Sequence, residues 1–260
     1  MKAVLWDVDA DGGIGWITLH RPEVRNALNA EMLDALQSAL KEAQAREDIR
    51  TVVLRGEGSA FCAGGDLKEI QTLGPFGVRR LLNEKIRPLL RSLMLLDKPV
   101  IAALNGPVAG AGIGLALACD VVLAAKEATL ITAFGKVGAM PDAAMIYFLV
   151  QHIGLKQAME LILRGEPLSA EAAHALGLYT RVVEREALEA LTLEWARDLA
   201  RGPTLAYAMA KRAARDAVRL PFDAFMDLES ASQALLHFSA DHQEGIAAFL
   251  AKRPPQFQGK

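Results

Sequence analysis

A mixed α/β fold with a helical C-terminal third is the fold class that the sequence predicts, and three observations predict it. Apolar residues make up 52% of the 260-residue chain, enough to fill the core of one large domain, alone or with a small appendage. Strand, strand and helix patterns follow one another near the N-terminus, and this order returns in the middle of the chain. From about residue 143 onward the patterns are mainly helical.

The first half of the chain supplies the strands. "KAVLWDV" (2–8) and "GIGWITLHRP" (13–22) predict two strands joined by a glycine-rich turn, and residues 29–48 predict a helix behind the cap Asn29. "TVVLRGEG" (51–58) is typical of a buried strand. Residues 76–96 then form an amphipathic helical pattern that either tolerates or kinks at Pro88.

The second half repeats the order before the helices take over. "KPVIAALNG" (98–106) predicts another strand, and the small residues of "PVAGAGIGLALACD" (107–120) predict a helix that packs very closely against a neighbour. The segments "VVLAA" (121–125) and "ATLITA" (128–133) are strand-like. The later helices are broken by short turns and by the strand-like "LGLYTRVVE" (176–184).

Composition excludes several classes of function. The net charge is −2, and the one dense basic stretch, "KRAARDAVR" (211–219), contains an acid, so we expect neither nucleic acid nor an anionic membrane as a partner. Two cysteines rule out a disulfide framework. No secretory signal pattern begins the chain, and no uncharged apolar run reaches the roughly 18 residues of a membrane span. We therefore expect a cytoplasmic protein.

Common catalytic motifs are absent. The glycines at 110, 112 and 114 leave Leu115 where a dinucleotide fingerprint needs its third glycine, and neither a GxSxG elbow nor a GK[ST] phosphate loop occurs. The five histidines have no metal-ligand spacing, so none receives a role and no metal is expected. Cys62 has no basic neighbour within several positions, which favours a small buried filler over a nucleophile.

Two glycine-rich stretches and one acid remain as candidates. "FCAGGDL" and "NGPVAGAGIG" each follow a predicted strand, and each is either a tight turn or a source of backbone N–H groups for an oxyanion hole. Asp142 is the single carboxylate of "FGKVGAMPDAAMIYFLV" (134–150), so it is either the N-cap of the following helix or a group tuned for chemistry by its apolar neighbours Met140, Ala143, Ala144 and Met145.

Four segments together carry a resemblance to a known family. They are "LHRPEVRNALN" (19–29), "SAFCAGGDLKEI" (59–70), "KPVIAALNGPVAGAGIGLALACDVVLA" (98–124) and "EGIAAFLAKRPPQF" (244–257). In this order they resemble the crotonase superfamily, the enoyl-CoA hydratase/isomerase family, and the C-terminal segment is especially similar to that of the ring-forming isomerases of phenylacetate degradation. The resemblance implies an acyl-CoA substrate, with coenzyme A part of the substrate and no other cofactor.

The resemblance also implies an architecture. It predicts a crotonase-type ββα spiral core over residues 1–200 that holds the acyl-CoA site. Residues 201–260 would form a helical C-terminal region that assembles a homotrimer or a dimer of trimers.

Individual site residues follow from matching positions in the family motifs. Gly65 in "CAGGD" and Ala111 in "NGPVAGA" would donate the two peptide N–H groups that hold the thioester oxygen and stabilise an enolate. The residues expected to line the CoA channel are Val24, Arg25, Ala27, Ala63, Asp66, Leu67 and Lys68. Lys252 and Arg253 are further candidates for contact with CoA, from the same or a neighbouring subunit. The alternative is that both are solvated surface residues.

The chain departs from the family where hydratases carry two glutamates, because those positions hold Gly114 and Phe134. Asp142 falls where some members without these acids place a catalytic aspartate. A single carboxylate suits isomerisation, since it can take a proton from one carbon and return it to another without water. The resemblance therefore favours a double-bond or ring isomerase with Asp142 as general acid/base.

Other functions stay open at this point. A hydratase would need an acid in another place, for which Glu84 is a remote candidate, and a catalytically silent acyl-CoA binder would keep the same fold. A dehalogenase that uses Asp142 as nucleophile is disfavoured, because the helix at 76–96 has no histidine and Phe134 replaces the expected tryptophan. The acyl group stays unidentified, since the segments expected to shape its pocket, 70–90, 132–145 and the C-terminal helices, are apolar and permissive.

Overall fold

The computed structural model describes residues 2–260, apart from the side chain of Ala133, and it is built on a six-stranded sheet. The strand order is β1-β2-β3-β4-β6-β8, in which only β1 and β2 pair antiparallel. The strands are β1 Val4–Asp9, β2 Ile14–Leu19, β3 Thr51–Gly56, β4 Val100–Leu104, β6 Val121–Ala125 and β8 Arg181–Val183. The predicted mixed α/β class is confirmed.

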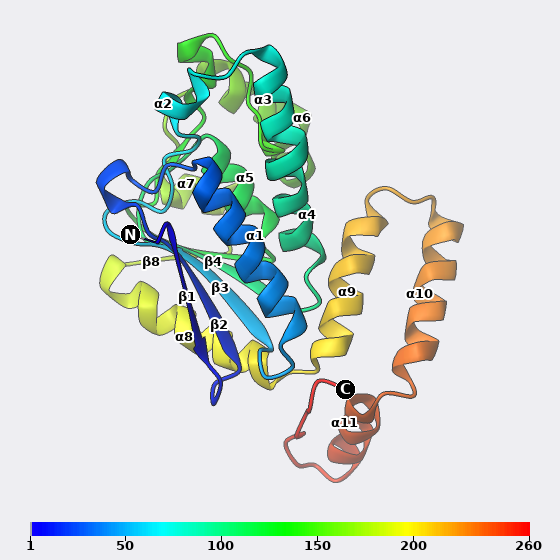
Figure 1. Ribbon diagram of the computed structural model, residues 1–260. Coiled ribbons are helices and arrows are strands. Elements are labelled where there is room, and N and C mark those ends of the chain that lie inside the picture. The colour runs from blue at the N-terminus through cyan, green and yellow to red at the C-terminus, as the bar shows by residue number, and fades with distance from the viewer. Residues whose placement is uncertain (1) are drawn as a thin grey trace.

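Two layers of helices cover the sheet (Figure 1). Helix α8 (Arg185–Arg201) packs on one face, where Leu188 and Ala196 join a core cluster with inward side chains of β2, β3, β4 and β6. The larger cluster lies on the other face, beneath α1, α4, α5 and α6. The bounds of these four helices are α1 Ala30–Ala45, α4 Arg87–Leu95, α5 Ala111–Ala118 and α6 Met145–Arg164.

Local sequence signals explain where several helices begin. The Asn29 side chain accepts a hydrogen bond from the Met32 amide at 2.9 Å and caps α1, as predicted. The predicted helix over 76–96 is continuous but changes pitch ahead of Pro88. It runs as α3 (Pro75–Leu81), a π-helical turn (Leu82–Ile86) and α4, because proline has no N–H to give to the carbonyl four residues earlier.

A second, two-stranded parallel sheet joins the loops at one edge of the fold. It pairs β5 (Val108–Ala109) with β7 (Leu130–Ile131), so the predicted strand over 128–133 is shorter than expected. Helix α5 starts directly after β5, and it is buried along its whole length, as the small residues of this segment predict. The other short elements are the 3-10 turns Pro22–Val24 and Ala133–Val137, and the helices α2 Leu67–Ile70 and α7 Ala170–Ala175.

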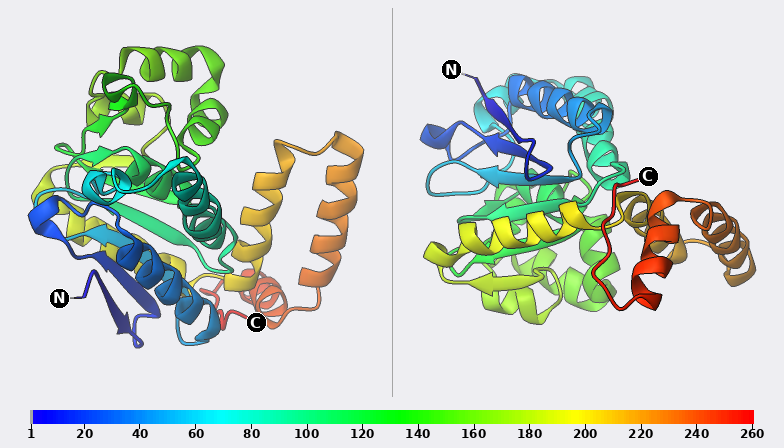
Figure 2. Two further views of the ribbon diagram at one scale, coloured as in Figure 1. Left: turned by 45° about the horizontal axis from the view of Figure 1, so that its top comes forward. Right: turned by 90° about the horizontal axis from the view of Figure 1, so that it is seen from below.

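Three helices leave the sheet as a projecting arm (Figure 2). The arm consists of α9 (Thr204–Ala217), α10 (Phe222–Leu236) and α11 (Ala240–Leu250). After α11 the chain runs back to the body, where the Arg50 guanidinium donates to the Phe257 carbonyl at 2.9 Å. The buried Asp241 carboxylate accepts from the Gln258 and Gly259 amides at 2.6 and 2.8 Å. The last residues thus tie the arm to the sheet.

A part-buried ion network fixes the base of the arm to the body. Asp120, just before β6, pairs with Lys211 and Arg215 of α9, and its carboxylate also accepts from the Val100 amide at 2.9 Å. The neighbouring cations Arg212 and Arg219 pair with Asp97 and Asp216. Lys211, Arg212, Arg215 and Arg219 of the basic stretch 211–219 therefore all form ion pairs within the protein.

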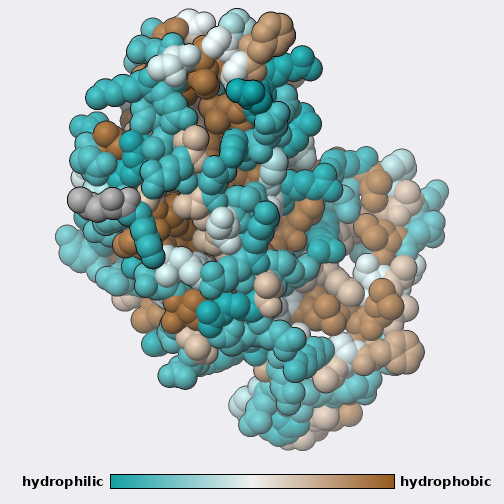
Figure 3. Space-filling view, viewed as in Figure 1, coloured by the Kyte–Doolittle hydropathy of each residue, from teal (hydrophilic) through white to brown (hydrophobic). Residues whose placement is uncertain are grey.

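Apolar side chains remain exposed on the arm (Figure 3). Phe222 is 75% exposed, Phe238 84%, Phe249 82% and Leu250 76%. Among the helices of residues 2–260, none is both long and apolar enough to cross a bilayer.

Candidate functional site

The two glycine-rich loops meet at one edge of the main sheet. One follows β3 and the other follows β4, and β3 and β4 are neighbouring parallel strands. The carboxyl ends of parallel strands lie at the same edge, which brings the loops together and makes this edge the usual ligand position in open α/β sheets. The Ala109 amide donates to the Cys62 carbonyl at 2.9 Å and joins the loops directly.

Close packing between the loops requires glycine at position 64. Gly64 has φ of +94°, and a methyl group built on it would lie 3.0 Å from the Ala109 carbonyl oxygen and 3.3 Å from the Ala111 nitrogen. Both the backbone conformation and the contact exclude a side chain there. Gly64 therefore brings its neighbour Gly65 close to the first residue of α5.

The amides of Gly65 and Ala111 are unsatisfied donors. Neither donates a hydrogen bond to any group within residues 2–260, although the amides of Leu28, Ala63 and Asp66 around them are all paired. Ala111 is the first residue of α5, so its N–H also has the partial positive charge of the helix N-terminus. Two adjacent unpaired amides can hold a carbonyl oxygen that gains negative charge.

The two segments expected to line the CoA channel are joined by backbone hydrogen bonds. The Ala63 amide donates to the Arg25 carbonyl at 2.9 Å, and the Leu28 amide donates to the Gly64 carbonyl at 2.7 Å. The predicted lining residues from both segments, Val24, Arg25, Ala27, Ala63, Asp66, Leu67 and Lys68, are thus brought together beside Gly65. Of these, Arg25, Ala63, Leu67 and Lys68 are exposed to solvent.

Asp66 serves the structure of this loop. Its carboxylate accepts two hydrogen bonds from the Arg21 guanidinium, each 3.0 Å long, and one from the Lys68 amide at the start of α2. Desolvation opposes ionisation, but the Arg21 hydrogen bonds and charge outweigh it and lower the pKa of Asp66. The Asp66 carboxylate is therefore occupied within the protein.

Two supporting residues, Arg21 and Asn26, were not predicted from the sequence. Asn26 is fully buried, and its amide nitrogen donates to the carbonyls of Glu57, Ala60 and Phe61. It holds a positive φ of 58° and fixes the loop that carries Arg25. Nothing in the sequence shows which distant carbonyls this amide meets; the polar run "RPEVRN" is the only signal.

Cys62 is buried, and its thiol donates to the Asn26 carbonyl at 3.2 Å. Burial raises the pKa of Cys62 to about 12, so the thiol stays protonated at neutral pH. The prediction that it is a buried filler is confirmed.

Asp142 lies just before a turn and does not cap a helix. Helix α6 begins at Met145, and its N-cap is Ala144, so the expectation that Asp142 caps this helix is wrong. The Asp142 carbonyl accepts from the Met145 amide at 2.9 Å, while its carboxylate accepts no hydrogen bond and forms no ion pair with any other residue among 2–260. Burial raises the pKa of Asp142 above its ordinary value of 3.8.

The surroundings of Asp142 differ from the expected apolar cover. Ala143 and Met145 are buried, but Met140 is 73% exposed and Ala144 is also exposed. The two alanines have φ of 49° and 60°, a left-handed conformation that costs about 1–2 kcal/mol per residue for L-amino acids. Strain of this kind gathers at functional sites.

The two positions where the family resemblance expects hydratase glutamates lie beside the same loops. Gly114 is buried in α5 against the Ala143 carbonyl, and the Phe134 ring lies over Gly110, next to Ala111. Neither residue can transfer a proton. Asp142 is the carboxylate on the chain segment that packs against α5.

Comparison with known proteins decides the family. The family model described as "Enoyl-CoA hydratase/isomerase" matches residues 9–260. The chain belongs to the enoyl-CoA hydratase/isomerase family. This family acts on acyl-CoA thioesters, so the chain is an enzyme of the class that the four motifs indicate.

Relatives of this family carry both reaction names. The chain is 43% identical over 248 residues to a "Probable enoyl-CoA hydratase" of Rhodobacter capsulatus, covering 95% of each protein. It is 42% identical over 255 residues to the 1,2-epoxyphenylacetyl-CoA isomerase of Escherichia coli, covering 95% of this chain and 96% of the relative. The crystal structure of an enoyl-CoA hydratase from Polaromonas sp. JS666 superposes with a TM-score of 0.92 at 35% identity, over 98% of this chain and 99% of that one. The crotonase fold is confirmed.

The remaining candidates for CoA contact or acid catalysis lie on other parts of the chain or already form an ion pair. Arg253 forms a two-bond ion pair with Glu244, at 2.6 and 2.8 Å, and Lys252 lies exposed beside it at the end of α11. Glu84 is exposed on the π-helical turn. In the described part of the chain, no three His, Cys, Asp or Glu side chains gather as metal ligands.

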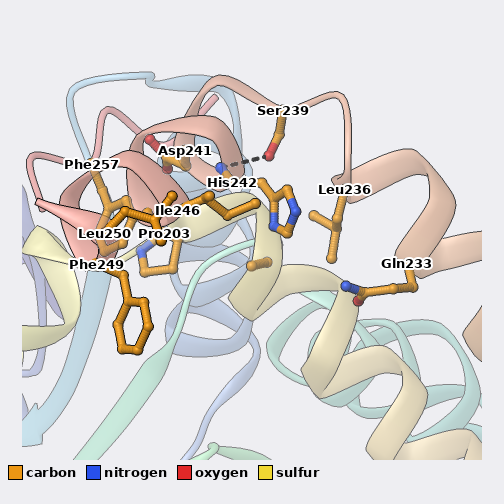
Figure 4. Close-up of a pocket in the computed structure, with 12 residues that line it drawn as sticks. Pro203, Gln233, Leu236, Ser239, Asp241, His242, Ile246, Phe249, Leu250 and Phe257 are labelled. Atoms are coloured by element: carbon orange, nitrogen blue, oxygen red, sulfur yellow. Dashed lines mark hydrogen bonds between the residues drawn. The ribbon is translucent and has the colours of Figure 1, made fainter.

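A pocket of about 390 Å³ lies in the arm (Figure 4), and no residue of the glycine loops lines it. None of the three proposed catalytic residues, Gly65, Ala111 and Asp142, lines this pocket. Its walls come from α9, α10, α11 and the C-terminal tail, and they are Pro203, Ala206, Gln233, Leu236, Ser239, Asp241, His242, Gly245, Ile246, Phe249, Leu250 and Phe257.

Proposed function

We propose that the protein is an acyl-CoA isomerase that moves a double bond or rearranges a ring through a thioester enolate. Asp142 carries this proposal, because it is a half-buried carboxylate without a partner and with a raised pKa, on a turn packed against the helix that begins with Ala111. The positions where the family resemblance expects hydratase glutamates hold Gly114 and Phe134.

The first step would be polarisation of the thioester. The Gly65 and Ala111 amides donate to the thioester oxygen, which lowers the pKa of the neighbouring C–H and stabilises the enolate. One such donor contributes about 3–4 kcal/mol to the transition state in other oxyanion holes. The free N–H groups and the α5 dipole support this role.

The second step would be proton transfer by one group. The ionised Asp142 carboxylate takes a proton from a carbon next to the thioester carbonyl, and the protonated acid returns it to another carbon of the enolate system. No water enters the product. Burial raises the pKa of Asp142, which makes its carboxylate a stronger base for taking the proton from carbon.

The CoA portion would lie across the joined loops. Arg25 and Lys68 are exposed cations at this edge and suit the CoA phosphates, while the backbone around Ala63 and Asp66 borders the channel. Lys252 and Arg253 sit on the arm, so contact with CoA from them would come through assembly.

Assembly into a homotrimer or a dimer of trimers is part of the proposal. The exposed aromatic and aliphatic side chains of the arm support it, since monomers rarely expose large apolar patches. The arm would pack against neighbouring copies, in line with a division between a core at 1–200 and an oligomerisation region at 201–260.

The test is Asp142→Asn, a change that keeps shape and removes proton transfer. Wild-type protein is incubated with 3-enoyl-CoA, 2-enoyl-CoA and an epoxidised aryl-CoA, and the products are followed by spectra and mass. We expect an isomer from wild type, a loss of about 10²- to 10⁴-fold in kcat for the variant, and unchanged acyl-CoA binding by calorimetry. An active variant would contradict the role of Asp142. A hydrated wild-type product would favour the hydratase function, and binding without turnover would favour a silent binder.

A further inference from the structure

Gly114 lies in direct contact with the turn that carries Asp142. A methyl group built on Gly114 would lie 2.0 Å from the Ala143 carbonyl oxygen and 3.3 Å from the Ala143 Cβ. Real Cβ atoms do not approach a backbone oxygen this closely, so the carbonyl fills the space that a side chain at 114 would need. Any larger residue there has to displace the turn.

The turn has no local sequence that would hold its shape. Its two central residues are alanines with φ of 49° and 60°, although turns with two positive φ angles favour glycine, asparagine or aspartate. Ala143 is 5% exposed and Met145 is fully buried. The conformation is therefore maintained by packing, which includes the packing of the Ala143 carbonyl against Gly114.

Gly114 also shares a helix with a proposed oxyanion donor. It follows Ala111 by three residues in α5, which places the two on neighbouring turns of the same helix side. Every residue of α5 is buried, so packing fixes this helix within the core. A group fixed to Gly114 is fixed relative to the Ala111 amide as well.

We propose that Gly114 is a positioning residue, which holds the Ala143 carbonyl against α5 and so sets the place of the Asp142 carboxylate relative to the Ala111 amide. The catalytic meaning of this contact rests on the proposed function, but the contact itself does not. It also follows that position 114 has no room for a carboxylate side chain while Asp142 keeps its place.

The experiment compares Gly114→Ala with the matched control Gly245→Ala. Gly245 also lies within a helix, α11, but its added methyl group would meet only the Phe257 ring at 3.4 Å, an ordinary contact. The readouts are the melting temperature, kcat and KM, and the titration of the Asp142 carboxyl by ¹³C NMR on aspartate-labelled protein. The Asp142 resonance is assigned by its absence in Asp142→Asn.

We expect Gly114→Ala to shift the pKa of Asp142 down toward 3.8, because the displaced turn exposes the carboxylate to water. We expect kcat to fall about 100-fold with KM changed by less than about threefold, since misplacement of a reacting group by about 1 Å has such an effect. Gly245→Ala should leave all of these values as in wild type. A folded Gly114→Ala protein with the wild-type Asp142 titration would overturn the proposal.

A second pair of variants covers the case in which Gly114→Ala fails to fold. Ala144→Gly relaxes the exposed end of the turn, so the double variant Gly114→Ala/Ala144→Gly can move its turn away from the new methyl group. Relative to Ala144→Gly, the double variant should show the lowered pKa and the loss in kcat. Equal titration curves for the two would overturn the proposal.

The titration separates this proposal from the proposed function. If wild type turns over no acyl-CoA, the isomerase function fails, yet the Asp142 resonance still reports whether Gly114 positions the carboxylate.

Discussion

The glycine-loop site and the C-terminal arm are incomplete in opposite ways. At the site, polar groups lack partners: the Gly65 and Ala111 amides and the Asp142 carboxylate. On the arm, apolar groups lack partners: Phe238 is 84% exposed and Phe249 82%. Unsatisfied amides call for a ligand with a hydrogen-bond acceptor such as a carbonyl oxygen, whereas exposed aromatic side chains call for another protein surface. The contrast indicates that the glycine-loop site is the place of the chemistry and the arm the place of assembly.

The largest effect is expected from a change that separates the two glycine-rich loops of the site. Gly64→Ala places a methyl group against the Ala109 carbonyl in a backbone conformation that alanine avoids, and this should part the two loops. Loss of one oxyanion donor lowers kcat by about 10²- to 10³-fold. Steady-state kinetics with an isomerisable enoyl-CoA checks this. Wild-type kcat in the variant would show that the closeness of the loops does not matter.

The base of the arm should respond next. Lys211→Met removes a charged hydrogen-bond donor to the part-buried Asp120 carboxylate and should lower the free energy of unfolding by about 1.5–3 kcal/mol. The matched control is Arg212→Met, which breaks the exposed pair with Asp97 and should cost no more than about 1 kcal/mol. Urea denaturation of both variants measures the difference, and equal losses would mean that the Asp120 network does not anchor the arm.

The exposed apolar side chains of the arm give a prediction about assembly. Phe249→Gln should weaken the proposed oligomer by about 2 kcal/mol or more, which is the size of an aromatic hot spot. Phe76→Gln is the control, because Phe76 is 86% exposed but belongs to α3 of the body. Light scattering across a concentration series gives the mass of wild type and of each variant. A wild-type protein that is monomeric at all concentrations would contradict the assembly.

The smallest expected effect is on stability as a function of pH. Burial raises the pKa of Asp142, so the folded state binds its proton more tightly than the unfolded state. Its contribution to stability is present below the unfolded pKa and is lost as pH rises through the folded pKa. Asp142→Asn should therefore melt at a higher temperature than wild type at pH 7, and the gap should close toward pH 4. A gap that is constant with pH would contradict the raised pKa.

Sequence patterns predicted most of the fold because strands and helices follow from periodicity and caps. Asn29 caps α1 as expected, and the small residues after β5 form the buried helix α5. The π-helical turn before Pro88 and the shortness of β7 were not foreseen, because they depend on how one proline and one loop fit the rest of the fold.

The position of the candidate site was predicted in part, and the roles of its residues stay predictions. Motif positions led to Gly65, Ala111 and Asp142, and the fold brings their chain segments together. The positive φ angles of Ala143 and Ala144 and the carbonyl against Gly114 had no sequence signal, because they arise from tertiary packing that overrides local preference. For the same reason Asp142 appeared to be a helix cap, while the structure gives that place to Ala144.

The measurement that tests the central claim most directly is the mass of the product formed from 3-enoyl-CoA in ¹⁸O-labelled water. The account predicts a product with the mass of the substrate, no ¹⁸O, and a shifted double bond, formed by wild type and not by Asp142→Asn. A product heavier by one molecule of labelled water, formed equally by both proteins, would contradict it.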